Sequence, residues 1–103
     1  MSSLASDDPA KSPGAVTRIL KIVNEKGLHA RASAKFVQLV EKYDAKVTVS
    51  RNGESAGGDS IMGLMMLAAG IGTSITVSAT GPQAQDVIAA LDTLVSSRFG
   101  EEE

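Results

Sequence analysis

The sequence predicts an α+β domain in which helices cover one face of a four-stranded antiparallel sheet. Three short segments alternate apolar and polar residues, as half-buried strands do, and a turn signal after one of them implies a fourth strand. Two longer segments repeat apolar residues at helical spacing, and a short helix lies between them, so the order is β-α-β-β-α-β-α. Each strand has one apolar face. Helices on one side of the sheet therefore bury every apolar stripe together.

The first strand and the first helix lie on either side of a loop that ends in glycine. Residues 16–23 are predicted as a strand with Leu20 and Ile22 on one side, and the loop 24–27 follows it. Residues 30–43 are predicted as a helix because their apolar positions recur at helical spacing. These positions are Ala32, Phe36, Leu39, Val40 and Tyr43.

A hairpin is predicted in the middle of the chain. Residues 46–51 alternate, with Val47 and Val49 on one face. Asn52-Gly53 is a strong signal for a two-residue hairpin turn, because both residues tolerate positive φ angles. A second strand is therefore expected near residues 54–57.

The second half of the chain adds a short helix, a strand and a long helix. Ser60 is a natural N-cap for a helix that runs through about Leu67. Residues 74–80 alternate as a strand, with Ile75, Val77 and Ala79 inward. Gly81-Pro82 ends this strand and opens the last helix, with Pro82 in its first turn. The last helix has the most regular apolar stripe, made of Ala84, Val87, Ile88, Leu91, Leu94 and Val95.

Length and composition indicate one small domain with an aliphatic core. The chain has 103 residues, 43% of them hydrophobic, with only two Phe, one Tyr and no Trp. The domain is expected at residues 15–99. Residues 1–14 are rich in Ser, Asp, Pro and Ala and are expected to form a disordered tail. Residues 100–103, which end in glutamates, are expected to be a frayed acidic C-terminus.

Composition also excludes several classes of function. A net charge of −2 argues against a generic nucleic-acid-binding protein, which would be basic. Without cysteine the chain has no disulfide, thiol nucleophile or zinc-thiolate site, and we expect no metal. No apolar run is long enough to span a bilayer, and the N-terminus has no apolar signal core. We therefore expect no membrane insertion and a cytoplasmic location.

The single histidine, His29, lies where a loop turns into the first long helix. The start of a helix has unpaired backbone N–H groups and the positive end of the helix dipole, which together suit an anion such as phosphate. An imidazole here could hold a phosphoryl group covalently while the backbone and Arg31 neutralise its charge. The competing interpretation of such a histidine is a surface or capping residue.

Two parts of the chain carry specific motifs. One is Gly27-Leu28-His29-Ala30-Arg31, followed by Ala34-Lys35-Phe36-Val37, and the other is Ser60-Ile61-Met62-Gly63-Leu64. Together they resemble the HPr family, the phosphocarriers of the phosphoenolpyruvate-dependent phosphotransferase system. The first motif is similar to the family's active-site segment, and the second to the segment that holds its regulatory serine. The resemblance runs from about residue 16 to residue 98 and includes the hairpin near Asn52-Gly53. It implies an open-faced β-sandwich with three helices on one face.

The resemblance implies that His29 accepts a phosphoryl group from Enzyme I and passes it to an enzyme IIA-type domain. The backbone N–H of Ala30 and the side chain and N–H of Arg31 would balance charge on the phosphoryl oxygens. The family uses Nδ1 of its histidine. Such a protein is a stoichiometric carrier rather than a free-standing catalyst, and it needs no cofactor. It would act in sugar uptake or in a regulatory, nitrogen-type branch, and it is expected to be a monomer.

The short helix is expected to present a docking surface beside His29. Leu64 and Leu67 are assigned to the core, and the remaining apolar residues cannot all point inward on so short a helix. Flexible Met side chains suit a surface that fits more than one partner. The expected docking residues are Ile61, Met62 and Met65.

Ser60 is expected to cap the short helix, and the resemblance implies a second role as a phosphorylation site for an HPr kinase/phosphorylase. A phosphate at a helix N-terminus is locally favourable because of the helix dipole and the free N–H groups. It would place negative charge on the docking surface without unfolding the helix. The neighbouring Asp59 makes that phosphate less favourable.

The chain departs from the family pattern at several positions. Ala32 stands where the family often has proline, so the start of this helix is expected to be looser. Gln38, Glu41 and Gly63 stand where relatives from enteric bacteria often carry lysines. Docking is therefore expected to depend less on positive charge, and these departures favour the regulatory branch.

Two other classes of function compete with the phosphocarrier. One is an HPr-like regulatory binding module that acts through partner docking without phosphotransfer. Some relatives lose the histidine, whereas this chain keeps His29, which disfavours that class. The other is a metal- or nucleic-acid-binding module, for which the sequence lacks a ligand cluster and a basic stripe.

Overall fold

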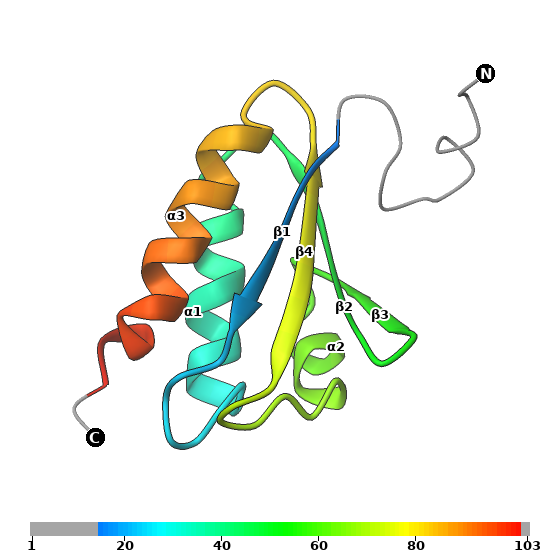
Figure 1. Cartoon of the computed structure of the whole chain (residues 1–103). Helices are drawn as coiled ribbons and strands as arrows, with labels where there is room; N and C mark the ends of the chain where they lie inside the picture. The colour runs from blue at the N-terminus through cyan, green and yellow to red at the C-terminus, as the bar shows by residue number, and fades with distance from the viewer. Residues whose placement is uncertain (1–14, 102–103) are drawn as a thin grey trace.

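A four-stranded antiparallel sheet forms one layer of the molecule, and helices cover one of its faces (Figure 1). The computed structural model describes residues 15–101, so the predicted tail at 1–14 and the last two glutamates lie outside the described residues. The strands lie in the order β1-β4-β2-β3. This is the predicted βαββαβα fold. The elements are β1 Val16–Lys21, α1 Ala30–Val40, β2 Lys46–Arg51, β3 Glu54–Gly57, α2 Ile61–Met66, β4 Ser74–Thr80, α3 Ala84–Ser96 and the 3-10 turn η3 Arg98–Gly100.

The two faces of the sheet differ in composition, as the alternation predicts. On the helix-facing side, Ile75 and Val77 of the central strand β4 lie opposite Leu20 of β1 and Val49 of β2, and all four are buried. On the open side, Thr76 lies opposite the exposed Ile19. Most apolar residues of the strands therefore meet the helices, and Ile19 is an exposed exception on the open side.

The hairpin forms as predicted. Asn52 and Gly53 have φ angles of 53° and 83°, which a type I′ turn requires at both central positions. The turn joins β2 to β3, and both strands have the predicted bounds. A left-handed conformation is rare for most residues but costs asparagine and glycine little, so this dipeptide sets the register of the pair.

The apolar stripes of α1 and α3 pack on the sheet and form the core. The predicted stripe of α3 is buried, except that Leu94 is only partly buried. In α1, Phe36 is fully buried, whereas Leu39 is only partly buried against the core. The largest fully buried side chains are Phe36, Phe99, Ile22, Leu64, Ile75, Ile88 and Leu91.

The first helix ends three residues earlier than predicted, at Val40 instead of Tyr43. The backbone N–H groups of Lys42 and Tyr43 donate to the carbonyls of Leu39 and Val40, three residues back. The chain therefore tightens into a last turn that continues the helical spacing without α-helical hydrogen bonds. Tyr43 still packs against the core, which explains why its position matches the stripe.

Two other predicted ends shift by two residues each. β1 ends at Lys21, although Ile22 is buried and its N–H donates to the carbonyl of Thr73 in the loop before β4. The last helix begins at Ala84, so Pro82 lies in the turn before it instead of in its first turn. Within residues 15–101, no helix is long and apolar enough to cross a membrane.

The last described residues form a turn that packs on the domain. After α3 the turn η3 buries Phe99, which is 1% exposed, in the core. Gly100 completes this turn, and the side chain of Glu101 contacts residues of the first loop. Apolar periodicity did not place Phe99 in the core, because the turn after α3 has no helical repeat.

Candidate functional site

His29 is the N-cap residue of α1. Its φ and ψ of −74° and −179° are extended, and its carbonyl accepts the N–H of Ser33 at 2.8 Å, which begins the helix. The imidazole makes no capping hydrogen bond, so it leaves the first N–H groups of the helix to another acceptor. The side chain is 26% exposed. His29 therefore lies at a helix start, as predicted, and its imidazole is partly exposed.

The loop before His29 is held against the loop after α2. Gly27 has a φ of +63°, and a Cβ at this position would lie 2.3 Å from the carbonyl oxygen of Ala69. The N–H of Leu28 donates to the same carbonyl at 2.9 Å, and Leu28 is buried. Only glycine allows both this φ angle and this approach. The position of His29 relative to the end of α2 therefore depends on Gly27.

A carboxylate from the end of the chain lies against the imidazole. Oε2 of Glu101 is 2.5 Å from Nε2 of His29, and Oε1 accepts a hydrogen bond from Nδ2 of Asn24 at 3.2 Å. Asn24 is fully buried, and its Nδ2 also donates to the carbonyl of Gly27 at 2.9 Å. Sequence reasoning missed both Glu101 and Asn24. No local pattern points to Glu101, because 72 residues separate it from His29.

The other predicted anion-binding groups lie in the first turn of α1. Ala30 and Arg31 are the first two residues of the helix, so their N–H groups point out of its N-terminal end. The side chain of Arg31 is exposed, and it has no ion-pair partner among residues 15–101. The structure does not bring the guanidinium into contact with His29. It leaves the guanidinium available at the same end of the helix.

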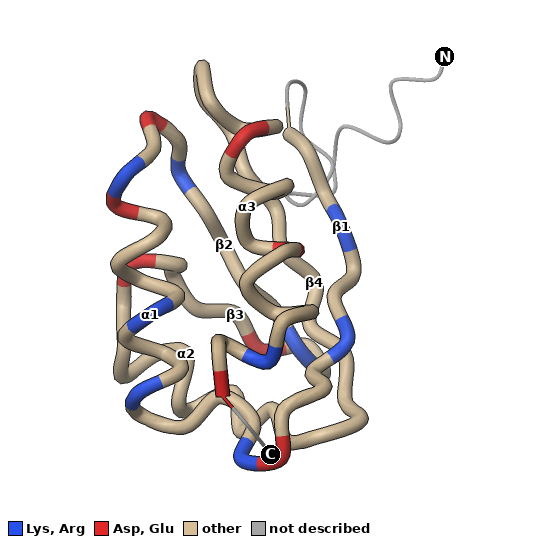
Figure 2. The backbone as a smooth tube through the Cα atoms, turned by 90° about the vertical axis from the view of Figure 1, so that its left-hand side faces the viewer, with Lys and Arg blue, Asp and Glu red and all other residues tan. Residues whose placement is uncertain are grey.

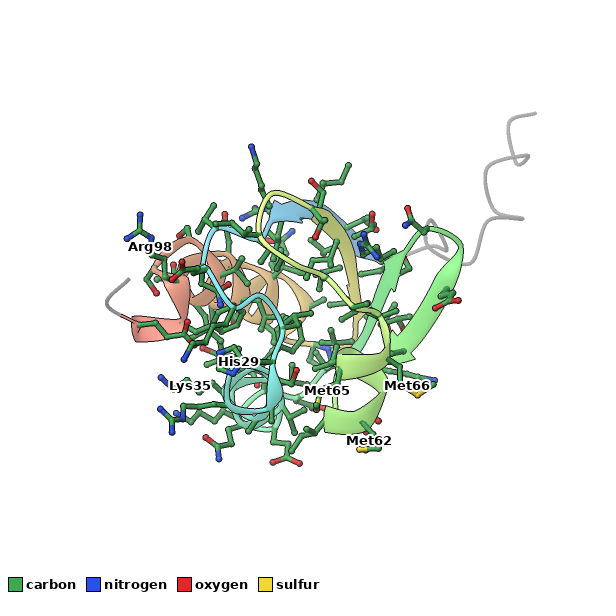
Figure 3. All side chains as sticks on the ribbon, turned by 90° about the horizontal axis from the view of Figure 1, so that it is seen from below. His29, Lys35, Met62, Met65, Met66 and Arg98 are labelled. Carbon is green, nitrogen blue, oxygen red and sulfur yellow. The ribbon has the colours of Figure 1, made fainter. Side chains whose placement is uncertain are left out.

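The short helix α2 lies beside α1 and exposes apolar side chains next to the His29 end (Figure 3). Leu64 and Leu67 are buried, as predicted. The three predicted docking residues are exposed: Ile61 by 39%, Met62 by 70% and Met65 by 39%. Met66 of the same helix was missed and is 75% exposed. We call these four residues of α2 the apolar patch.

Ser60 caps α2 as predicted. Its Oγ accepts the N–H of Gly63 at 3.0 Å, and its backbone is extended as an N-cap requires. Ser60 is half-buried, and its neighbour Asp59 is exposed. Residues 15–101 contain no group of three or more side chains suited to hold a metal ion.

Charges of both signs surround this end of the molecule. Figure 2 shows basic and acidic residues interspersed along the helical side, without a broad region of one sign. Lys35 of α1 donates to the carbonyl of Phe99 at 2.6 Å, which ties α1 to the C-terminal turn. The electrostatic surroundings of the imidazole therefore consist of individual charges of both signs, and no broad basic or acidic surface lies around it.

A family model described as "PTS HPr component phosphorylation site" matches residues 16–97, nearly all of the described domain. The chain belongs to the HPr family. The phosphocarrier protein HPr of Cupriavidus necator is 51% identical over 82 residues, which are 80% of this chain and 92% of the relative. The phosphocarrier protein NPr of Shewanella violacea is 37% identical over 84 residues, which are 82% of this chain and 92% of the relative.

Solved HPr structures share the fold. HPr-C-His of Thermoanaerobacter tengcongensis matches with a TM-score of 0.81 and 36% identity, and the match covers 85% of this chain and 99% of that protein. A structure of an HPr dimer from the same organism matches with a TM-score of 0.67 and 38% identity, over 80% of this chain and 94% of that one. The HPr-family fold, predicted as an open-faced β-sandwich, is therefore confirmed. The expected monomeric state of this chain stays a prediction.

Proposed function

We propose that this chain is a cytoplasmic phosphocarrier. His29 accepts a phosphoryl group from Enzyme I and passes it to an enzyme IIA-type domain. The observation that carries the proposal is the partly exposed imidazole at the first turn of α1, in a member of the HPr family. A nucleophile that serves two partner proteins must be accessible and must stay fixed relative to the groups that bind phosphate. The N-cap position meets both requirements.

The proposed transfer depends on positioning and charge balance. Nδ1 of His29 forms the bond to phosphorus while the bond between phosphorus and the donor's imidazole nitrogen breaks. The N–H groups of Ala30 and Arg31 and the guanidinium of Arg31 would hold the phosphoryl oxygens. The same step toward the acceptor regenerates the free imidazole. The chain is then a stoichiometric carrier, not an enzyme with turnover of its own.

The apolar patch supports a docking role. Large exposed apolar side chains cost solubility unless a partner covers them, and here four of them lie on the short helix α2, which packs beside α1. Unbranched Met side chains adapt to partners of different shape. We assign to the patch the contacts with both Enzyme I and the IIA-type acceptor, since each must approach His29 from this end.

Ser60 is the proposed regulatory site, phosphorylated by an HPr kinase/phosphorylase. Its Oγ already faces the N–H of Gly63, so a phosphate there would meet a donor and the positive end of α2. The added charge would lie next to Ile61 and Met62 of the patch and would weaken apolar docking. Phosphorylation would then slow transfer without unfolding the domain.

The relay could serve sugar uptake or a regulatory, nitrogen-type branch. Gln38, Glu41 and Gly63, where enteric relatives often carry lysines, favour the regulatory branch. The branches differ in the acceptor, so a competition between a sugar-specific and a nitrogen-type IIA domain for the phosphorylated chain distinguishes them.

The test of the carrier function is phosphorylation by a matching Enzyme I with phosphoenolpyruvate. The wild-type chain should acquire stoichiometric phosphate that is labile in acid and stable in alkali, and His29→Ala should acquire none. Gln85→Ala, an exposed change on α3, should behave as wild type. If the wild type takes up no phosphate, or if His29→Ala takes up as much, the carrier proposal is wrong and a docking-only regulatory module is favoured.

A further inference from the structure

The C-terminal turn brings a carboxylate to Nε2 of the imidazole, the ring nitrogen other than the proposed nucleophile. Arg98, Phe99 and Gly100 have φ angles of 60°, 56° and 78°, three left-handed residues in succession. They reverse the chain after α3, so that the C-terminal end lies next to the start of α1 (Figures 1 and 3). Two successive non-glycine residues in this conformation persist only where other contacts hold them.

Contacts of three kinds hold this turn. The Phe99 side chain is buried in the core, and its carbonyl accepts a hydrogen bond from Nζ of Lys35 at 2.6 Å. The N–H groups of Gly100 and Glu101 donate to the carbonyls of Ser97 and Arg98. Glu101 therefore follows a fixed turn, and its side chain is only 17% exposed.

The carboxylate of Glu101 has a distinct partner for each oxygen. Oε1 accepts from Nδ2 of Asn24, and Oε2 faces Nε2 of His29. Asn24 cannot easily turn its amide over, because Nδ2 also donates to the carbonyl of Gly27. A carboxylate only accepts hydrogen bonds, so Nε2 of His29 must carry the proton in this contact.

We propose that Glu101 is a positioning residue: its carboxylate holds the proton of His29 on Nε2 and so keeps Nδ1 as the free nucleophile. This inference rests on the proposed carrier function. A neutral imidazole has one protonated and one unprotonated nitrogen, and the hydrogen bond at one decides which is free at the other. Here the buried Asn24 orients the carboxylate, and the carboxylate orients the ring.

The same contact balances charge through both transfers. The lone pair of Nδ1 forms the N–P bond as the donor's P–N bond breaks and its electron pair returns to the donor imidazole. Nε2 keeps its proton, so the phosphorylated ring carries a formal positive charge that faces Glu101. When the acceptor nitrogen attacks, the N–P electron pair returns to Nδ1. No proton needs to enter or leave His29 in either step.

Two variants separate positioning from structure, because they predict different tautomer populations of His29. Glu101→Ala removes the acceptor, so the ring should shift toward the tautomer mixture of free imidazole. Glu101→Gln has one acceptor oxygen, which the N–H of Asn24 occupies, so its NH₂ should face Nε2 and drive the proton to Nδ1. The nitrogen-15 spectrum of His29 reports these populations without any partner protein. We expect the tautomer ratio to change roughly tenfold or more.

The kinetic arm is single-turnover transfer from phosphorylated Enzyme I. Glu101→Ala should slow transfer roughly tenfold, and Glu101→Gln should slow it further, because Nδ1 is then protonated. Glu54→Gln, an exposed carboxylate of β3, is the matched control and should match wild type in every readout. Unchanged thermal midpoints would separate these effects from loss of folding.

The outcomes distinguish this inference from the function on which it rests. Equal tautomer populations in wild type and both variants overturn it, as do unchanged transfer rates in both. If wild type accepts no phosphate, the carrier function fails. The tautomer measurement then still decides whether Glu101 sets the proton on His29.

Discussion

The hydroxyl of Ser60 caps α2 and is also the proposed site of phosphorylation. Its Oγ accepts the N–H of Gly63 and begins α2. A Cβ on residue 63 would lie 3.0 Å from this oxygen and 3.0 Å from the Cβ of Ala56, so glycine leaves the cap its room. The sequence predicted the cap because the preference of serine for this position is local. The proposed phosphorylation would use the same donor.

Ser60→Ala should therefore remove both the helix cap and the proposed phosphorylation site. The free energy of unfolding, measured by urea denaturation, should fall by about 1 kcal/mol through loss of the cap. Labelling by an HPr kinase with ATP should disappear. Ser55→Ala, an exposed serine of β3, should keep both values. Undiminished labelling of Ser60→Ala would contradict the regulatory assignment.

At the scale of elements, α2 is divided between core and surface. It has only six residues, and Leu64 is its single buried side chain. The helix is too short to be stable alone, so Leu64 and the loop contacts that follow it hold the helix on the domain. Its outer side is then free to carry Met62, Met65 and Met66. The division was predicted from the sequence, although Met66 was missed, because six residues carry too little periodicity to assign every side chain.

Met62→Glu should weaken binding to Enzyme I, measured by calorimetric titration, while leaving the thermal midpoint nearly unchanged. Met62 is 70% exposed, so a charge there costs the fold little but opposes apolar docking. Ile19→Glu is the matched control, because Ile19 is 69% exposed on the open face of the sheet. Equal weakening by both variants would show that the patch is not the docking surface, and a large fall in the midpoint of Met62→Glu would place Met62 in the core.

At the scale of the whole molecule, three segments far apart in the chain meet at one end. The loop after β1 and the start of α1 contact the loop after α2 through Gly27, Leu28 and Ala69. The C-terminal turn closes over them through Lys35 and Glu101. The proposed nucleophile is thus supported from both halves of the chain, and its geometry depends on the complete fold.

Phe99→Ala tests whether the C-terminal turn is part of that fold. A large buried side chain replaced by alanine leaves a cavity, so the free energy of unfolding should fall by about 3 kcal/mol. Urea denaturation measures it. Leu94→Ala, only partly buried on α3, should cost less. A loss for Phe99→Ala below that of Leu94→Ala would mean that the turn only rests on the surface.

Features that depend on neighbouring residues could be predicted from the amino-acid sequence. Strand alternation, the helical stripes, the Asn52-Gly53 turn and the position of His29 at a helix start depend on residues within about one turn of each other. The observed end of α1 differs from the predicted one because hydrogen bonds to carbonyls three residues back continue the helical spacing of apolar residues beyond Val40. The contact between Glu101 and His29 follows from the tertiary structure alone. It joins residues 72 apart through a left-handed turn that is held by burial of Phe99, the side chain of Lys35 and backbone hydrogen bonds, and no periodic pattern encodes it.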